Sequence, residues 1–202
     1  MYYLNVILLL MLAANFASFI WAAYAFFGLS KQQQVAKGTR WLSSLVLLAQ
    51  GWLLVWVAQA EIRLAWHYVL GVMLVFGSSL LFWRCLQIHG ERSLSPAYAE
   101  DLPEHLVKKG PYRWIRHPFY TAYLLSYLGG VVAAPGWWIL PALLLPYGVY
   151  HAASSFEEAK FAKSTLSRAY ADYRRQAGRF WPKLGWGWAS EQARMKGKQG
   201  EA

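Results

Sequence analysis

Residues 1–29 contain no charged side chain, and this stretch constrains the fold more than any other part of the sequence. A helix needs about 20 predominantly apolar residues to cross the hydrocarbon core of a bilayer, and residues 3–28 are long enough. Because hydrocarbon offers no partners to backbone N–H and C=O groups, such a segment crosses as an α-helix, which satisfies them internally. The stretch therefore predicts a membrane-spanning helix.

Four more apolar runs follow, at residues 41–58, 66–86, 118–134 and 137–153. The whole chain is 57% hydrophobic and 15% charged, whereas soluble proteins carry about 25% charged residues. The runs do not show the alternation that is typical of a half-buried strand. We therefore expect an all-α, polytopic membrane protein with about five transmembrane helices. It forms a single domain over residues 1–183, and a flexible tail follows over residues 184–202.

Lysine and arginine residues indicate the orientation in the membrane, because cytoplasmic loops are enriched in them. With the N-terminus outside, every Lys and Arg except Arg63 falls on the inner side. We expect an integral protein of a bacterial-type inner membrane, in which the segment before Pro118 and the C-terminal region both face the cytoplasm. The net charge of +10 then fits anionic lipid headgroups rather than nucleic acid, because the basic residues flank the apolar spans.

Beyond the fifth span, residues 156–175 place Ala, Leu and Tyr side chains at helical spacing with charged residues between them. This pattern is typical of an amphipathic helix. We expect this C-terminal helix to lie on the cytoplasmic face of the membrane.

A polar segment ends at Arg116 and His117, where the fourth apolar run begins with Pro118. Proline suits the first turn of a helix and keeps the preceding residue out of the α conformation, so we expect His117 at the mouth of that helix. The first N–H groups of a helix lack partners within it and carry the positive end of its dipole. With Arg116 beside them, they predict a site for a carboxylate or a phosphate.

Glu157 and Glu158 lie at the cytoplasmic end of the fifth predicted span, close to the hydrocarbon. Ionised groups are costly there unless they are paired, and the nearest cations in the five-span arrangement are Arg113 and Arg116. The acidic pair therefore predicts a polar pocket at the membrane face, with Tyr112 and Tyr120 as candidate walls. The chain lacks the residue spacing of a metal site, so no metal is expected.

The polar segment, the acidic pair and the C-terminal region carry an ordered set of short motifs. They are Leu106-Val107, Gly110-Pro111-Tyr112-Arg113, Arg116-His117-Pro118-x-Tyr120, Glu157-Glu158, Tyr170-x-x-Tyr173 and Arg179-Phe180-Trp181-Pro182. The set resembles the isoprenylcysteine carboxyl methyltransferase and phospholipid methyltransferase superfamily, and the resemblance covers residues 70–183. It implies an integral membrane enzyme that uses S-adenosylmethionine without the soluble Rossmann-type fold.

The resemblance also implies roles for individual residues. It assigns cofactor binding to His105, Leu106, Val107, Tyr112, His117, Pro118, Phe119, Tyr120 and Glu158. Arg116 and Glu157 become the candidate catalytic residues. Many carboxyl methyltransferases of this family have a histidine two places before the Leu-Val pair, whereas this chain has Glu104 there and His105 one place later.

Methyl transfer from a sulfonium is an in-line displacement, so alignment and a dry site matter more than a strong acid. We expect a methyltransferase that acts at the cytoplasmic membrane face on a lipophilic or lipid-linked acceptor, either isoprenylcysteine carboxylate-like or phospholipid-like. Family members that methylate carboxylates carry an arginine shortly before the acidic pair, whereas residues 151–155 of this chain contain none. The acceptor atom therefore stays open between carboxylate, amine and thiol, and we expect the acceptor to enter laterally from the lipids.

Two other functions fit the sequence. A sterol-reductase-like membrane oxidoreductase has a related helical architecture and would bring NADPH to the same region. A non-enzymatic scaffold or permease subunit would carry the same basic interfaces and would need no nucleotide-derived ligand. The sequence leaves the oligomeric state open.

Overall fold

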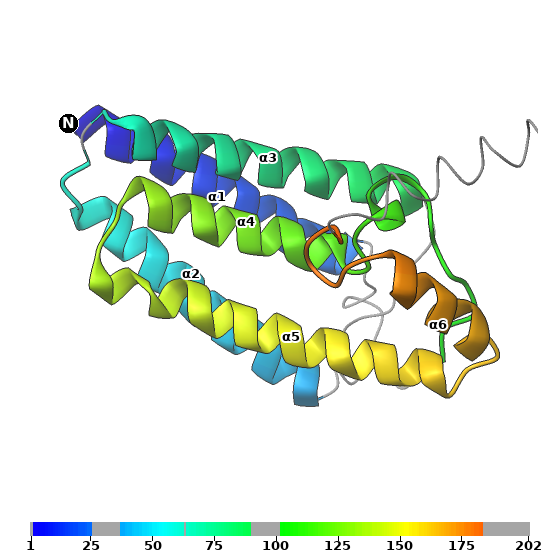
Figure 1. Cartoon of the computed structure of the whole chain (residues 1–202). Helices are drawn as coiled ribbons and strands as arrows, with labels where there is room; N and C mark the ends of the chain where they lie inside the picture. Colours follow the sequence, from blue (N-terminus) through cyan, green and yellow to red (C-terminus); the bar gives the residue numbers. More distant parts are fainter. Residues whose placement is uncertain (1, 26–36, 63, 90–101, 184–202) are drawn as a thin grey trace, which may run out of the picture.

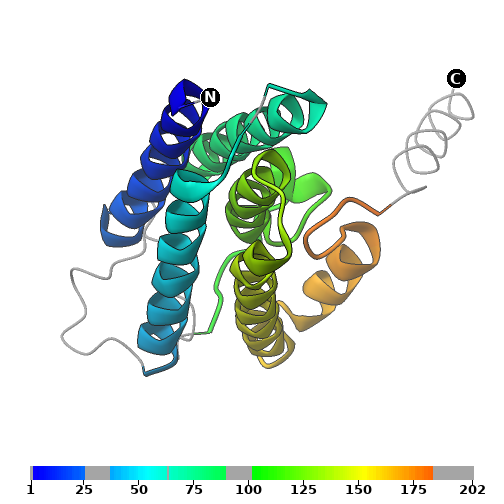
Figure 2. The ribbon, with the colours of Figure 1, turned by 90° about the vertical axis from the view of Figure 1, so that its left-hand side faces the viewer.

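The computed structural model describes residues 2–25, 37–62, 64–89 and 102–183. In these ranges five long helices lie side by side, and a short sixth helix packs at one end of the bundle (Figures 1 and 2). The elements are α1 (Tyr2–Ala25), α2 (Lys37–Gln59), α3 (Trp66–His89), η1 (Gly110–Arg113), α4 (Pro118–Ala133), η2 (Trp137–Ile139), α5 (Pro141–Ala162) and α6 (Ser167–Gln176).

The all-α prediction is confirmed for the described ranges. The only strand-like feature within them is an isolated parallel bridge between Ile115 and Gly178. The predicted flexible tail, at 184–202, lies outside the described residues.

Within the described residues, three helices are long and apolar enough to cross a membrane, namely α1 from Tyr3 onward, α2 and α3. Their most apolar windows have mean hydropathies of 2.2, 1.7 and 1.9. They match the first three predicted spans, although residues 26–28 of the first lie outside the described residues. The 16-residue α4 begins at Pro118 as predicted, and the 22-residue α5 ends in a charged stretch. The chain thus has the apolar helices of an integral membrane protein.

The region of the fifth predicted span starts differently from the prediction. The 3-10 turn η2 occupies its first residues, and α5 begins at Pro141 and continues past residue 153 to Ala162. Proline has a fixed φ and no N–H, so it suits the first turn of a helix. The start of the helix therefore lies at Pro141 rather than at residue 137.

The predicted amphipathic helix over residues 156–175 is two helices in the structure, because α5 ends at Ala162 and α6 follows after a break. At the break, the Ser164 hydroxyl donates to Phe161 O at 2.9 Å and accepts from Leu166 N at 3.2 Å. Serine side chains compete with helical hydrogen bonds in this way, which explains the interruption. The second helix can then fold back beside the N-terminus of α4 (Figure 1).

Close backbone contact joins α3 to α4. A Cβ atom built on Gly71 of α3 would lie 2.5 Å from the backbone oxygen of Gly129 on α4. Small residues permit such an approach between helices in membranes. Asn15 of α1 adds a buried polar contact, because its amide donates to Val75 O at 3.1 Å and lies 3.3 Å from the Ser126 hydroxyl. These contacts hold α4 against α1 and α3. They therefore set the position, along the axis of the bundle, of the residues at the N-terminus of α4.

Candidate functional site

His117 stands at the mouth of α4, as the sequence predicts. Its φ of −123° and ψ of 63° lie outside the helical region, and Pro118 occupies the first turn of the helix. The C-terminal segment holds the preceding backbone, because Arg116 N donates to Gly178 O at 2.8 Å and His117 N donates to Arg179 O at 3.1 Å. This short parallel pairing brings Arg116, His117 and Arg179 to the same end of the bundle.

Glu158 of α5 is the centre of the ionic contacts at this end. Its side chain is only 7% exposed, and Arg116 donates to its Oε1 from Nε at 3.0 Å and from Nη2 at 2.9 Å. His117 Nε2 lies 3.2 Å from the same oxygen, and Arg179 Nη2 donates to Oε2 at 3.2 Å. Because desolvation of a carboxylate is costly, a glutamate is buried only where such partners surround it.

Opposing effects set the pKa values of this cluster. Burial raises the pKa of Glu158, but hydrogen bonds from His117 and Arg116, together with their charge, outweigh burial and lower it to about 2. Burial lowers the pKa of His117, but hydrogen bonds and charge from Glu157 and Glu158 raise it above its ordinary value of 6.5. The cluster therefore favours an ionised Glu158 beside a protonated His117.

Glu157 has different surroundings from its neighbour. Its side chain is 31% exposed, and its Oε2 lies 3.3 Å from His117 Nδ1. The Tyr120 hydroxyl donates to its other oxygen, Oε1. Within the described part of the chain no guanidinium pairs with Glu157, whereas two pair with Glu158 at 3.2 Å or less. His117 thus bridges a fully paired carboxylate and a more open one.

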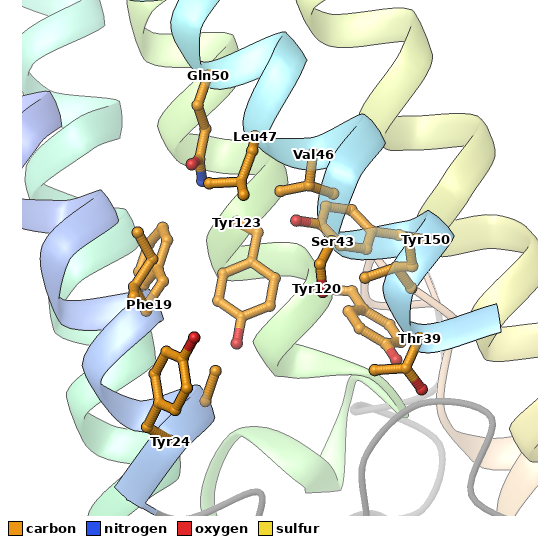
Figure 3. A pocket seen from close by; sticks show the side chains of 13 residues that line it. Phe19, Tyr24, Thr39, Ser43, Val46, Leu47, Gln50, Tyr120, Tyr123 and Tyr150 are labelled. Atoms are coloured by element: carbon orange, nitrogen blue, oxygen red, sulfur yellow. The ribbon is translucent and has the colours of Figure 1, made fainter. Parts of the chain in front are cut away.

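A cavity of about 310 Å³ lies beside this cluster, between α1, α2, α4 and α5 (Figure 3). Its wall is mostly apolar, and α2 contributes the polar side chains of Thr39, Ser43 and Gln50. Tyr120 lines the cavity and also contacts Glu157, so the cavity and the ionic cluster meet at its hydroxyl. The lining residues are Phe19, Ile20, Ala23, Tyr24, Thr39, Leu42, Ser43, Val46, Leu47, Gln50, Tyr120, Tyr123 and Tyr150.

Tyr112 and Phe119, two of the predicted cofactor-binding residues, are buried behind the start of α4. The Tyr112 hydroxyl lies 2.8 Å from His89 Nε2, and the Tyr173 hydroxyl donates to the Tyr112 carbonyl at 2.6 Å. Phe119 packs edge-on against Phe82 of α3, with ring centroids 5.7 Å apart. These contacts tie α3 and α6 to the segment that carries Arg116 and His117.

The predicted residues before Gly110 lie on an extended segment. Leu106 packs against the tyrosines of α6, and Val107 packs against the main core. His105 is exposed, and neither a hydrogen bond nor an ion pair joins it to the described residues of the ionic cluster. The structure therefore brings the other predicted site residues to this end of the bundle but leaves His105 at the surface.

Sequence reasoning gave no role to Arg179 as an individual residue, although it stands in the Arg-Phe-Trp-Pro motif. Its Nη1 donates to Ser155 Oγ at 2.8 Å and lies 3.0 Å from His151 Nε2, while its Nη2 binds Glu158. Sequence reasoning also overlooked Tyr150, which stacks on Tyr120 with ring centroids 5.0 Å apart. In the sequence, the feature that could have pointed to Arg179 is its position as the first residue of the Arg-Phe-Trp-Pro motif.

The fold and the site define a class of protein, namely an all-helical membrane protein with an arginine, histidine and glutamate cluster at a helix mouth beside an apolar cavity. A model of the phospholipid methyltransferase family matches residues 66–171, and the chain belongs to this family. No curated protein sequence matches the chain.

One solved structure extends the comparison to the fold. The chain is similar to the eukaryotic intramembrane Ras methyltransferase ICMT (isoprenylcysteine carboxyl methyltransferase), with a TM-score of 0.57 and 18% sequence identity. The similarity covers 85% of this chain and 63% of that one, so this chain spans less than two thirds of the other's length. At this identity the likeness shows a shared fold. Together the two findings confirm the resemblance to the superfamily.

Proposed function

We propose that the protein is an S-adenosylmethionine-dependent methyltransferase that acts on a lipophilic or lipid-linked acceptor at the cytoplasmic face of a bacterial-type inner membrane. The observation that carries this proposal is the position of His117, which lies between Glu157 and Glu158 at the mouth of α4. Charged groups that can bind a zwitterionic cofactor thus stand next to a cavity suited to an apolar acceptor. Family membership supports the same reaction.

The donor set of the site fits S-adenosylmethionine, which carries a carboxylate, an ammonium, a sulfonium and ribose hydroxyls. The partly exposed Glu157 is suited to bind the ammonium or a ribose hydroxyl. The N–H groups of Phe119 and Tyr120, in the first turn of α4, are suited to bind the carboxylate. When bound, the cofactor supplies an electrophilic methyl group on sulfur.

Arg116 and Glu158 have a positioning role in this proposal. Three nitrogens of the Arg116 guanidinium already donate hydrogen bonds, two of them to Glu158 and one to the Ala177 carbonyl after α6. Arg116 would have to break these bonds to bind a ligand. Glu158 in turn orients His117, whose two ring nitrogens contact both carboxylates. Because methyl transfer depends on alignment, rigid support of these groups contributes to the rate.

The proposed acceptor site is the cavity next to Tyr120. Ile20, Tyr24 and Leu47 line it and are also exposed at the outside of the bundle, so an acceptor dissolved in the lipid has a lateral entrance between α1 and α2. An apolar wall excludes water from the reacting atoms. In this proposal α1 to α5 are the five membrane spans. The end of the bundle that carries the ionic cluster faces the cytoplasm.

Calorimetric titration of S-adenosylhomocysteine into the purified protein tests the proposed function. We expect saturable binding that His117→Ala abolishes and that His67→Ala, at the opposite end of the bundle, leaves intact. NADPH should not displace the bound S-adenosylhomocysteine. Displacement by NADPH would favour the reductase function. Failure of the folded parent protein to bind S-adenosylhomocysteine would contradict the proposal and favour a reductase or a scaffold.

A further inference from the structure

Tyr120 connects the cavity to the acidic pair. Its ring lines the cavity, and its hydroxyl donates a hydrogen bond to Glu157 Oε1. We propose that Tyr120 and Glu157 form a proton-accepting relay, and that the acceptor is therefore protic. An amine or a thiol loses a hydrogen from the atom that is methylated, whereas a carboxylate has none to lose. This inference rests on the proposed methyltransferase function.

Aromatic packing holds the Tyr120 ring in the wall of the cavity. The ring stacks on Tyr150 at 5.0 Å and 16°, and Tyr123 packs against both rings at 6.3 Å and 5.5 Å (Figure 3). Because the hydroxyl proton is directed toward Glu157, the oxygen lone pairs remain to accept a hydrogen bond. A group that donates hydrogen, such as an amine or a thiol, therefore fits this oxygen.

The charges around the cavity also disfavour a carboxylate acceptor. Among the described residues that line it, none is a lysine, an arginine or an acidic residue. The arginines of the neighbouring cluster, Arg116 and Arg179, both bind Glu158. The Tyr120 hydroxyl contacts the carboxylate of Glu157, and the Tyr120 ring stacks on His117 with ring centroids 5.8 Å apart. An anionic acceptor at the Tyr120 hydroxyl would approach that carboxylate, and the neighbouring His117 already contacts Glu157 and Glu158 with its two ring nitrogens. Repulsion between the two anions is strong where water is excluded.

Most of the wall that would contact the acceptor lies outside the residues that match the family. Apart from Tyr120, Tyr123 and Tyr150, every lining residue comes from α1 or α2, and both helices precede the residues 66–171 that match the family. The acceptor chemistry must therefore be inferred from these side chains and from the tyrosines that face them.

The relay accounts for every proton and electron pair. As the electron pair of the acceptor nitrogen or sulfur forms the new bond to the methyl carbon, the electron pair of the old carbon–sulfur bond stays on the donor sulfur. The acceptor's proton passes to Tyr120 Oη, while the hydroxyl proton of Tyr120 passes to Glu157 Oε1. Glu157 is 31% exposed and can return its proton to water.

Three ten-carbon probes with different headgroups test the inference, namely decylamine, decanethiol and decanoate. They are added to the full-length protein in lipid nanodiscs, and two readouts are taken. The first is the thermal unfolding temperature without cofactor, which reports binding in the cavity. The second is transfer of labelled methyl groups from S-adenosylmethionine. Tyr120→Phe keeps the ring and removes the hydroxyl, and Glu157→Gln removes the charge. Tyr68→Phe is the matched control, because its hydroxyl contacts Leu4 O at the far end of the bundle.

We expect decylamine to raise the unfolding temperature of the parent protein but not of Glu157→Gln, and decanoate to raise neither. Methyl transfer should occur to at least one of the two protic probes and fall about 100-fold in Tyr120→Phe, while S-adenosylhomocysteine binding is kept. Tyr68→Phe should behave like the parent.

Methylation of decanoate at the rate of the protic probes would overturn the inference, as would an unchanged rate in Tyr120→Phe or the absence of protic probe binding. In each of these cases the parent still binds S-adenosylhomocysteine, so the proposed function survives. If the parent protein does not bind S-adenosylhomocysteine, both the proposed function and this inference fail.

Discussion

At the scale of single residues, the two adjacent glutamates of α5 differ because their neighbours differ. Glu158 is buried and shares its two oxygens among Arg116, His117 and Arg179. Glu157 is more exposed and contacts His117 and the Tyr120 hydroxyl. A change of charge at Glu158 should therefore act on folding, whereas a change at Glu157 should act on ligands.

Removing the Glu158 charge should destabilise the protein strongly. Glu158→Gln leaves the guanidinium of Arg116, which is 6% exposed, without its counter-ion, and a broken buried pair of this kind costs about 3 kcal/mol. The matched control is Asp172→Asn, which breaks the Arg175–Asp172 pair at a site where the Asp172 side chain is 59% exposed. That exposed pair should contribute less than about 1 kcal/mol. Unfolding titrations in detergent compare the two, and equal losses would contradict the buried network.

The same network should make stability depend on pH at both ends of the range. The pKa of Glu158 is lowered from 4.5 to about 2 in the folded protein, so its stabilising contribution is present above pH 4.5 and is lost as pH falls toward 2. The pKa of His117 is raised above 6.5, so its contribution is complete below pH 6.5 and is lost as pH rises through the raised value. Unfolding temperatures measured from pH 2 to 9 should show both losses.

Two variants separate these contributions. Glu158→Gln should flatten the acid side of the profile, and His117→Ala should flatten the alkaline side. A parent profile that is flat between pH 4.5 and pH 2 would contradict the ionised state assigned to Glu158.

At the scale of elements, the contact between α3 and α4 depends on glycine. A Cβ on Gly71 would lie 2.5 Å from Gly129 O and 2.6 Å from the Cβ of Ala133, whereas a Cβ on Gly77 of the same helix would meet nothing within 4 Å. Gly71→Ala should therefore push the helices apart and destabilise the protein by about 1–3 kcal/mol. Gly77→Ala should be neutral or slightly stabilising, because alanine is the better helix former. Unfolding in a denaturing detergent measures both, and equal stabilities would argue against this packing.

The helices themselves were largely predictable from the sequence. Long apolar runs define α1 to α3, and Pro118 marks the start of α4, because apolar length and proline act locally. The ends of α5 were not predictable in the same way. The apolar run begins at residue 137, but the helix begins only at Pro141. At the other end, the side-chain hydrogen bonds of Ser164 interrupt a sequence pattern that is otherwise amphipathic.

The candidate site was predictable where the chain carries motifs. Arg116, His117 and the acidic pair were predicted to meet because a helix mouth and a buried carboxylate both need partners. The cavity was not predictable, since Thr39, Ser43 and Gln50 lie on α2 with no motif around them. Their role depends on how α2 packs against α4 and α5, which is a property of tertiary structure.

At the scale of the whole molecule, the proposed chemistry requires a defined orientation in the membrane. The start of α4 and the end of α5 lie at one end of the bundle, and the connection between α2 and α3 lies at the other (Figure 1). Cysteine labelling can separate the two ends, because Cys85, the only native cysteine, is buried and can be replaced by alanine.

In that background, Thr165→Cys marks the exposed turn between α5 and α6, and Glu61→Cys marks the exposed opposite end. A membrane-impermeant maleimide should label Glu61→Cys in spheroplasts of a bacterial host and Thr165→Cys only in inverted membrane vesicles. The physical reason is that the basic residues around α6, including Arg174 and Arg175, favour the cytoplasmic side. Labelling of Thr165→Cys in intact spheroplasts would place the ionic cluster outside the cell, where cytoplasmic S-adenosylmethionine cannot reach it. That result would therefore contradict the topology and the proposed function together.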